Sequence, residues 1–348
     1  VNFYYPFNYG EKVFYRFTEM VGTNIFRRYP KLRLWVRLFE LMLGLFHTYA
    51  VIKIKSPKLV NYSMTSNLYI EYAFIKLVKL TSNSKIMITC HDVMPFETHY
   101  TDATTEVKKR LKFFELADFL LTHNENSKED LINLYNINSD KIIYHNFPVM
   151  DLSHIRDIAA IENDLISESK KKILFVGHAR KEKGLDLLLD AWELGVPQNL
   201  HMTVACNVPV GAKFKFDDIK GKNFTLIDRF LTDSEYASLI RQHDFVFLPY
   251  LKGTNSGIPG STISLGSIPV CSDIAMFRNN ELLDQGFLFK SGDVADLARC
   301  LNDISLLSVE DINEMNAGYK SRLASYRHDF SRNINSLYEI VIRKSKIN

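Results

Sequence analysis

Short β-like runs alternate with helical patterns along the whole chain of 348 residues, and no other feature constrains the fold as strongly. Alternation of this kind produces parallel sheets with helices on both faces, so we predict an α/β protein. The expected strands are Val1–Tyr5, Lys58–Tyr62, Lys85–Thr89, Phe119–Thr122, Lys141–His145, Lys172–Val176, Met202–Ala205, Phe224–Ile227, Phe245–Pro249, Ile268–Ser272 and Gly286–Phe289. The expected helices lie near 11–22, 31–52, 67–81, 104–117, 126–135, 184–194, 233–242, 258–266, 294–303, 310–325 and 326–346.

The chain is longer than one compact core usually supports, so two domains are expected. The alternating pattern occurs twice, which indicates two Rossmann-like domains in tandem, and a polar stretch near 147–170 separates them. We predict a first domain over 1–150, a second over 151–325, and a C-terminal helix over 326–348 that packs back on the first domain. Ligands of open parallel sheets bind beyond the carboxyl ends of the strands. The loops that follow strands are therefore the place to seek a function.

Composition and missing motifs exclude several classes of protein. Hydrophobic residues make up 46% and charged residues 24%, as in soluble globular proteins, and a net charge of +3 does not indicate nucleic-acid binding. The four cysteines are far apart and form no CxxC pair, which favours reduced thiols in a cytosol over disulfides or structural zinc. The sequence lacks the motifs GxxxxGK[ST], GxGxxG, GxSxG and DxD. P-loop, ordinary dinucleotide, nucleophile-elbow and Asp-pair metal sites are therefore not expected.

A basic turn follows the expected strand Lys172–Val176. Gly177 lets the chain turn, and Arg180 and Lys183 precede Gly184 and an amphipathic helix. Two cations beside a tight turn suit a diphosphate, because Arg binds it bidentately and Lys supplies a point charge. A solvated basic turn without any ligand explains the same residues equally well.

A loop of small residues follows the expected strand Phe245–Pro249 and leads into a helix that starts near Gly257 and Ile258. The free amides and the dipole at a helix N-terminus favour phosphate, and Asn255 and Ser256 add side-chain donors. Taken alone, the loop is better explained as a helix that is capped by Ser256 and binds nothing. Beside the basic turn, however, a phosphate site becomes the better interpretation.

These motifs together resemble the nucleotide-binding domain of family 4 glycosyltransferases. The resemblance is carried by VGHARKEKG, DFVFLPY, the SG before a helix and GSIPVCSD, and it is clearest over 173–290. It implies the GT-B fold, in which two Rossmann-like domains face each other across a cleft and the second holds a sugar-nucleotide donor. It also implies that Arg180 and Lys183 stabilise the departing diphosphate. The other donor contacts that it implies are Gly177, Arg229, Phe230, Glu235, Asn255, Ser256, Gly257 and Ile258.

The sequence departs from the family at two carboxylates. Many members carry two Glu seven residues apart in this loop and helix, and the corresponding positions here are Gly253 and Ser261. The usual carboxylate contacts to the donor sugar and ribose must therefore be replaced or absent. Retention of the anomeric configuration, which is typical of the family, rests on analogy for this chain.

Polar residues also follow the expected strands of the first domain. His91 and Asp92 come after one strand and His123 after the next. The family has a His at the first of these places, so the resemblance implies that His91 contacts the donor sugar, although a His that caps the strand end is nearly as good an explanation. Asp92 and His123 are candidates for the acceptor side. Gly10 allows close approach of the backbone to the donor, or only a turn. Lining of a polar cleft explains the histidines more simply than a metal cluster does, and we predict no metal site.

The segment 27–58 holds eight basic residues and one acid, together with Trp35, Phe39 and Phe46. Two interpretations stay open for the helix expected at 31–52. It is either a mostly buried helix that shows one edge to water, or a surface that lies on an anionic membrane. Neither this segment nor any other has the length and composition of a spanning helix.

We therefore predict a glycosyltransferase that moves a sugar from a nucleotide-diphosphate sugar to a glycan or lipid-linked acceptor. The resemblance implies a metal-independent, retaining enzyme without a cofactor, acting in bacterial surface polysaccharide synthesis in the cytoplasm, with peripheral contact to the inner face of the plasma membrane through 27–58. The alternative is a catalytically silent GT-B module that binds a sugar nucleotide or a partner transferase. The donor sugar, base, acceptor and linkage cannot be read from the sequence.

Overall fold

The computed structural model describes residues 30–63, 68–91, 93, 103–149, 152, 154–155, 170–195, 197–208, 214–219, 223–283 and 287–344. The chain forms two compact units, one of Val1–His145 with Leu337–Asn348 and one of Asn146–Ser336. The strand expected at Val1–Tyr5, the helix expected near 11–22, and the site candidates Gly10 and Asp92 lie outside the described residues.

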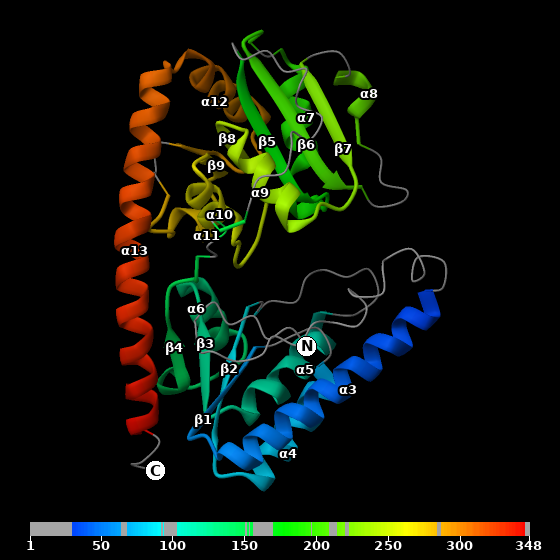
Figure 1. The fold of residues 1–348 in the computed structure, drawn as a ribbon, viewed down its shortest axis with the longest axis vertical. Coiled ribbons are helices and arrows are strands. Elements are labelled where there is room, and N and C mark those ends of the chain that lie inside the picture. Colours follow the sequence, from blue (N-terminus) through cyan, green and yellow to red (C-terminus); the bar gives the residue numbers. More distant parts are fainter. Residues whose placement is uncertain are drawn as a thin grey trace. The chain divides into compact units, whose positions relative to one another are not determined.

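The first unit is built on a four-stranded parallel sheet with the strand order β1-β2-β3-β4 (Figure 1). The strands are β1 (Leu59–Ser63), β2 (Lys85–Thr89), β3 (Phe119–Thr122) and β4 (Ile142–Tyr144). Its helices are α3 (Pro30–Lys55), α4 (Leu68–Thr81), α5 (Ala103–Leu116) and α6 (Glu125–Asn133), and a short 3₁₀ turn, Ser139–Lys141, precedes β4.

Side chains alternate across this first sheet, as the period of a strand requires. Ile86 and Ile88 point into a core that includes residues of α3, α4 and α5, whereas Met87 between them points to the opposite face. On that opposite face Met87 packs with Val341 from the last helix of the chain. The amide of Asn61 also donates to the hydroxyl of Tyr338 over 3.2 Å. The first sheet is thus covered on both faces.

The second unit is built on a six-stranded parallel sheet with the strand order β10-β9-β8-β5-β6-β7. The strands are β5 (Lys171–His178), β6 (Leu200–Asn207), β7 (Phe224–Asp228), β8 (Phe245–Leu248), β9 (Ile268–Ser272) and β10 (Leu288–Phe289). Numbered from β5 as the first strand and read from β7, this order is 3-2-1-4-5-6, the doubly wound order of Rossmann folds. The direction of winding reverses between β5 and β8.

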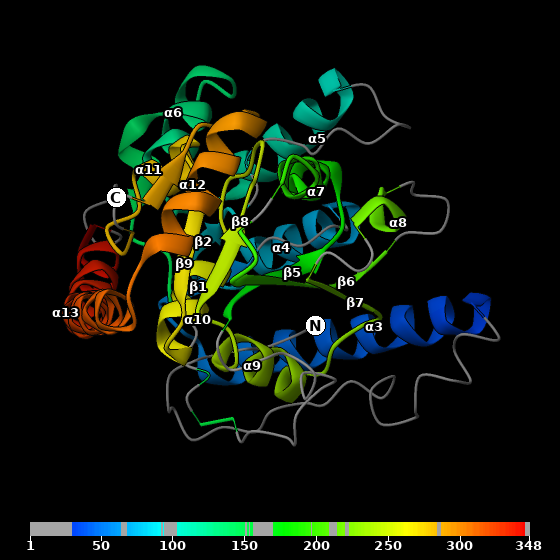
Figure 2. The same cartoon turned by 90° about the horizontal axis from the view of Figure 1, so that it is seen from above.

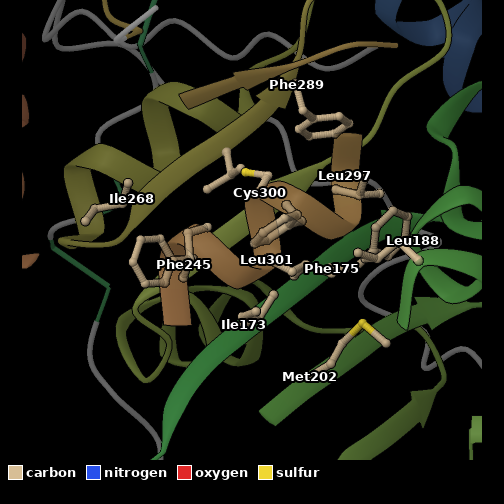
Figure 3. Close-up of a cluster of buried hydrophobic side chains, with 14 of the residues drawn as sticks. Ile173, Phe175, Leu188, Met202, Phe245, Ile268, Phe289, Leu297, Cys300 and Leu301 are labelled. Atoms are coloured by element: carbon tan, nitrogen blue, oxygen red, sulfur yellow. The ribbon is translucent and has the colours of Figure 1, made fainter. Parts of the chain in front are cut away.

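Helices cover both faces of the second sheet, as Figure 2 shows from above. They are α7 (Leu185–Glu193), α8 (Phe216–Ile219), α9 (Asp233–Arg241), α10 (Ile258–Leu265), α11 (Ala275–Arg278) and α12 (Val294–Leu306), with a 3₁₀ turn at Lys181–Lys183. One face of the sheet packs against α7 and α12 through residues such as Ile173, Phe175 and Phe245 (Figure 3). The other face packs against α9 and α10 through residues such as Leu174 and Val246.

The structure confirms the predicted α/β class with parallel sheets. It differs from the sequence-based prediction at the C-terminus, where one helix of 36 residues, α13 (Val309–Lys344), replaces the two helices expected at 310–325 and 326–346. The stretch around residue 326 contains neither proline nor glycine, so nothing in it ends a helix. The short helices α8 and α11 were not predicted either, because one turn is too short to show a periodic pattern.

Of the two interpretations left open for 31–52, the mostly buried helix is wrong for the described side chains of α3. Trp35, Phe39 and Phe46 are 68%, 65% and 72% exposed. Their exposure reflects where their side chains lie on the helix, since Leu45 and Ile52 on another side of α3 are buried. Among the described residues, no helix combines the length and apolar content that crossing a bilayer requires.

Candidate functional site

The topology of the second sheet identifies where a ligand is expected. Open parallel sheets bind ligands at the carboxyl ends of the two strands between which the winding reverses. These strands are β5 and β8, which pair through Ile173 with Phe245 and Leu174 with Val246. The basic turn after β5 and the small-residue loop after β8 therefore leave the sheet side by side.

Direct contacts hold these two loops together. The backbone N–H of Leu251 donates to the carbonyl oxygen of Glu182 over 2.9 Å. Gly184 has a φ of 65° and packs against the backbone of Pro249, where a Cβ atom would overlap the Pro249 carbonyl oxygen. Only glycine combines this φ with this close approach. The sequence thus fixes the loops against each other at the switch point.

Lys183 joins the two loops through its side chain. Its ammonium nitrogen lies 3.6 Å from the centre of the Tyr250 ring, in cation–π geometry. The Tyr250 hydroxyl lies 3.5 Å from Oγ of Ser256, and the same Oγ lies 3.4 Å from the backbone nitrogen of Ile258, the first residue of α10. The structure therefore brings Lys183, Ser256 and the start of α10 into one cluster, which we call the switch-point cluster.

The N-cap position of α10 is occupied by a glycine, which has no side chain to cap the helix. Gly257 is its N-cap residue, has helical dihedral angles and offers no capping side chain, and the Ile258 amide donates to Oγ of Ser256 over 3.4 Å. Ser256, which the sequence suggested as the cap, precedes the N-cap position. Uncapped amides at a helix N-terminus, together with the helix dipole, attract anions. Gly257 also packs near Phe147, since a Cβ atom there would meet the Phe147 ring at 3.8 Å.

Arg180 and Lys183 both act electrostatically on a residue that sequence reasoning missed, His178. Partial burial of the imidazole, and then the positive charges of Arg180 and Lys183, lower the pKa of His178 below its ordinary value. His178 is the last residue of β5 and follows Gly177, whose φ is 132°. A polar side chain directly after a glycine at a strand end was the available signal, but histidine has no preferred place in such a pattern.

Phe230 brings an aromatic surface beside His178. The two rings lie edge to face, with centroids 6.4 Å apart, and the Phe230 side chain is 59% exposed. Phe230 belongs to the loop between β7 and α9, so three loops of the second unit contribute to this edge of the sheet. An exposed ring beside a cluster of cations is a surface on which a planar base can stack.

Arg229 and Glu235 pair with each other at the start of α9. An Arg229 nitrogen lies 2.7 Å from a Glu235 carboxylate oxygen, and Glu235 forms a capping box with Thr232. Partial burial opposes ionisation of Glu235, but hydrogen bonds from Thr232 and the charge and hydrogen bond of Arg229 outweigh it and lower the pKa. This carboxylate is thus held in the cap of the helix. Its expected contact with a donor stays a prediction.

The histidines of the first unit lie in a row along the carboxyl ends of its strands. His91 Nε2 lies 2.8 Å from the hydroxyl of Ser63 at the end of β1. The His91 and His123 rings stack with centroids 5.5 Å apart, and His123 Nδ1 donates to the backbone carbonyl of His145 over 3.0 Å. No group of three or more metal-binding side chains occurs within the described part of the chain. Stacking and hydrogen bonds explain this row of rings.

Two family models match the chain. Residues 170–305 match the model described as Glycosyl transferases group 1, and residues 56–147 match Glucosyltransferase 3-like, N-terminal domain. No curated protein sequence matches the chain. The first model covers β5 to α12 and therefore includes the whole switch-point cluster.

Several solved structures share the fold at low sequence identity. Sucrose-phosphate synthase from Thermosynechococcus elongatus has a TM-score of 0.65 at 12% identity, over 86% of this chain and 78% of that chain. The HepE protein of Anabaena, in complex with UDP and glucose, has a TM-score of 0.61 at 12% identity, over 82% and 80%. A UDP-forming trehalose-phosphate synthase from Burkholderia vietnamiensis has a TM-score of 0.59 at 13% identity, over 86% and 78%. The chain therefore has the GT-B fold and carries a glycosyl transferases group 1 domain at residues 170–305.

Proposed function

We propose that this protein transfers a sugar from a nucleotide-diphosphate sugar to a hydroxyl group of a glycan or lipid-linked acceptor. The observation that carries the proposal is the position of the Lys183 ammonium, 3.6 Å from the Tyr250 ring, whose hydroxyl lies 3.5 Å from Oγ of Ser256 just before the start of α10. A cation and a helix N-terminus at the switch point of a doubly wound sheet form an anion site of diphosphate character.

The donor diphosphate would lie between Arg180, Lys183 and the N-terminus of α10. The two side chains and the helix dipole would neutralise the negative charge that builds on the diphosphate as the bond to the sugar breaks. This arrangement needs no metal ion to stabilise the leaving group, and we propose a metal-independent transfer. Retention of configuration is proposed on the family resemblance alone.

The other donor contacts follow from their places around this diphosphate. Phe230 would stack on the base, with Arg229 and Glu235 nearby. Gly177 would allow the donor close to the end of β5. The loop residues proposed to approach the phosphates or ribose are Asn255, Ser256, Gly257 and Ile258, and Gly10 is proposed to approach the donor from the first domain.

His91 is proposed to contact the donor sugar, with Asp92 and His123 on the acceptor side. A neutral or charged imidazole can donate a hydrogen bond to a sugar hydroxyl or to the oxygen that leaves. The hydrogen bond to Ser63 fixes which way the His91 ring faces. This proposal predicts an effect of His91 on turnover.

Uridine diphosphate is the first nucleotide to test, because it occurs with the HepE protein and is formed by the trehalose-phosphate synthase among the similar structures. Calorimetric titration with UDP, GDP, ADP and CMP compares the wild type with Arg180→Ala and Lys183→Ala. Each substitution is expected to weaken binding of the cognate nucleotide by about 10- to 100-fold, as loss of a charged hydrogen bond does. Lys181→Ala, on the same turn, is the matched control and should change affinity by less than about 2-fold. Equal losses in all three variants would overturn the assignment.

A contact with an anionic membrane is proposed for α3 and the segment around it, at the inner face of the plasma membrane of a bacterium that builds surface polysaccharide. Exposed Trp35, Phe39 and Phe46 supply apolar anchors, and Lys53 and Lys55 in the last turn supply positive charge. In sedimentation with vesicles of phosphatidylglycerol, Phe39→Ser with Phe46→Ser should lose binding that Leu306→Ser, another exposed apolar residue, retains. Unchanged binding, or equal binding to vesicles of phosphatidylcholine, contradicts the contact.

A catalytically silent module that binds a sugar nucleotide is the second candidate. It is favoured by one observation: Ser261 stands where many family members have a carboxylate, and its hydroxyl donates to the Gly257 carbonyl over 3.0 Å. Hydrolysis of the donor by the purified protein separates the candidates. Turnover that is lost in Arg180→Ala and His91→Ala supports the enzyme, whereas tight nucleotide binding without turnover supports the module.

A further inference from the structure

We propose that Tyr250 is a positioning residue that holds the Lys183 ammonium in place for the diphosphate. The proposal rests on the proposed donor site and adds a residue to it that contacts Lys183 and not the substrate. Tyr250 directly follows Pro249 at the end of β8, so it belongs to one loop of the switch-point cluster while Lys183 belongs to the other.

The Tyr250 ring is a fixed platform. The residue is only 1% exposed, and its ring packs against the Phe277 ring with centroids 5.3 Å apart. Its backbone carbonyl accepts hydrogen bonds from the hydroxyls of Ser272 and Ser291, over 2.5 and 3.2 Å. These contacts fix the ring and the backbone of the residue at once. The ring face that meets Lys183 therefore cannot turn away.

Lys183 is brought to this ring by its backbone. The 3₁₀ turn Lys181–Lys183 is followed by Gly184, whose contact with Pro249 fixes the end of the turn. On the preceding side, Glu182 accepts the hydrogen bond from Leu251. The backbone on both sides of Lys183 is thus attached to the residues on both sides of Tyr250. Only the long side chain of Lys183 remains to be ordered.

The ring orders that side chain before the ligand arrives. A free lysine side chain has about 2 kcal/mol of rotamer entropy, which a ligand must overcome when it immobilises the chain. At 3.6 Å from the ring centroid the ammonium is well inside the range of cation–π attraction. Because one side of the ammonium rests on the ring, the ring restricts the directions in which the ammonium can donate to phosphate oxygens.

Graded fluorination tests this proposal, because it weakens the negative ring face with little change in the size of the ring. Tyr250→Phe keeps the ring but removes the hydroxyl that lies 3.5 Å from Oγ of Ser256, so this variant is the reference for the series. Mono-, di- and trifluorinated phenylalanines at the same position withdraw electron density from the ring face, so the Kd for UDP should rise stepwise, by about 3- to 30-fold in total. The thermal midpoint of each variant shows that the fold persists. A Kd that does not change along the series would overturn the proposal.

A second background separates positioning from a merely structural role. In Lys183→Met the ammonium is absent, so fluorination of the ring should no longer change the Kd for UDP. If fluorination at position 250 raises the Kd for UDP equally in the proteins with Lys183 and with Lys183→Met, Tyr250 acts on the fold and not on Lys183. The donor site and the positioning role of Tyr250 are contradicted by different results. A wild-type protein that binds no nucleoside diphosphate contradicts the donor site, whereas nucleotide binding that does not respond to fluorination contradicts the role of Tyr250.

A signal that needs no ligand completes the test. Protons on the ε-carbon of a lysine above an aromatic ring are shifted upfield by the ring current. In the NMR spectrum of the unliganded protein, the Lys183 resonance should be upfield of those of exposed Lys181 and Lys252, and Tyr250→Leu should abolish the difference. A Lys183 resonance at the ordinary position in the wild type overturns the proposal even if UDP binds.

Discussion

Gly184 packs so closely against Pro249 that no side chain can start from its Cα atom without overlapping the Pro249 carbonyl oxygen. At the switch point, Gly184 ends the turn that follows β5 and Pro249 begins the loop that follows β8. Their contact involves backbone on both sides, so neither residue can move away by changing a rotamer. The two loops can therefore lie this close only because residue 184 has no Cβ atom.

Gly184→Ala should therefore destabilise the second unit and weaken UDP binding. A left-handed conformation costs a non-glycine residue about 1–2 kcal/mol, and the overlap with Pro249 adds to that cost. Gly266→Ala is the matched control, because Gly266 is also left-handed, with a φ of 91°, and has nothing within 4 Å of its Cβ position. Urea unfolding should show a larger loss of unfolding free energy for Gly184→Ala than for the control. Only Gly184→Ala should also bind UDP more weakly. Equal losses of stability would mean that the contact with Pro249 has no consequence.

Binding of a UDP-sugar should become tighter as the pH falls through the pKa of His178. In the free protein, partial burial and the charges of Arg180 and Lys183 lower that pKa. A bound diphosphate is negative and raises the pKa of His178. At a pH between the pKa of the free protein and that of the complex, binding therefore takes up a proton, and lower pH favours the complex. A UDP-sugar is the suitable ligand, because its diphosphate does not itself titrate in this range. Calorimetry should show this pH dependence in the wild type and a flatter profile in His178→Gln; identical profiles would count against the linkage.

The second unit should lose stability in mild acid through two of its histidines. Burial lowers the pKa of His243 to about 4, and the positive charge of Lys172 contributes to the shift. The hydrogen bond from His243 to the Leu239 carbonyl opposes it. Burial and nearby lysines lower the pKa of the less buried His201 to about 4 as well. The unfolded chain binds these protons near the ordinary pKa of about 6.5, so stability is lost as the pH falls from there towards 4.

Acidification should lower the free energy of unfolding by on the order of 3 kcal/mol through the nearly fully buried His243, and by less through His201. Urea unfolding followed by fluorescence of the buried Trp192 measures it. His243→Gln should unfold more easily than the wild type near neutral pH, because a hydrogen-bonded core residue is replaced, but should lose less stability on acidification. An unchanged pH slope would show that other groups control the acid transition.

His91→Ala should lower turnover by about 100-fold while leaving the affinity for UDP unchanged. The reason is that the residues proposed to hold the diphosphate all belong to the second unit, whereas His91 belongs to the first. Ser63→Ala removes one hydrogen-bond partner of His91 and keeps the imidazole, so it should give an intermediate loss of turnover. Initial rates at saturating donor, together with calorimetry of UDP, measure the two effects. A parallel loss of UDP affinity would assign His91 to binding and not to turnover.

The sequence predicted best what short local patterns determine. The strands Lys85–Thr89, Phe119–Thr122 and Ile268–Ser272 have the predicted bounds, because each is a short apolar run between polar residues. The start of α10 at Ile258 was also predicted, from a small-residue loop and a proline in the first turn. Local signals of this kind need no knowledge of the rest of the chain.

The sequence could not reveal what depends on residues far apart in the chain. Tyr250 gives no sign of its contact with Lys183, because that contact exists only once β5 and β8 are paired. His178 was missed for the same reason, since its pKa depends on how the neighbouring turn folds back. The exposure of Trp35 and Phe39 also could not be read from α3, where apolar residues occur on most of the helix surface.

The strand order also determines when the proposed donor site can form during synthesis. β6, α8, β7 and α9 all come between β5 and β8 in the chain, yet β5 and β8 are neighbours in the sheet. A chain that is still emerging from the ribosome therefore carries the basic turn long before it carries the loop that completes it. Strands that are far apart in the chain pair slowly. A ligand that binds only after β5 and β8 have paired would stabilise the chains in which this pairing has occurred. The donor would thus act as a late ligand-induced stabiliser of the newly made protein.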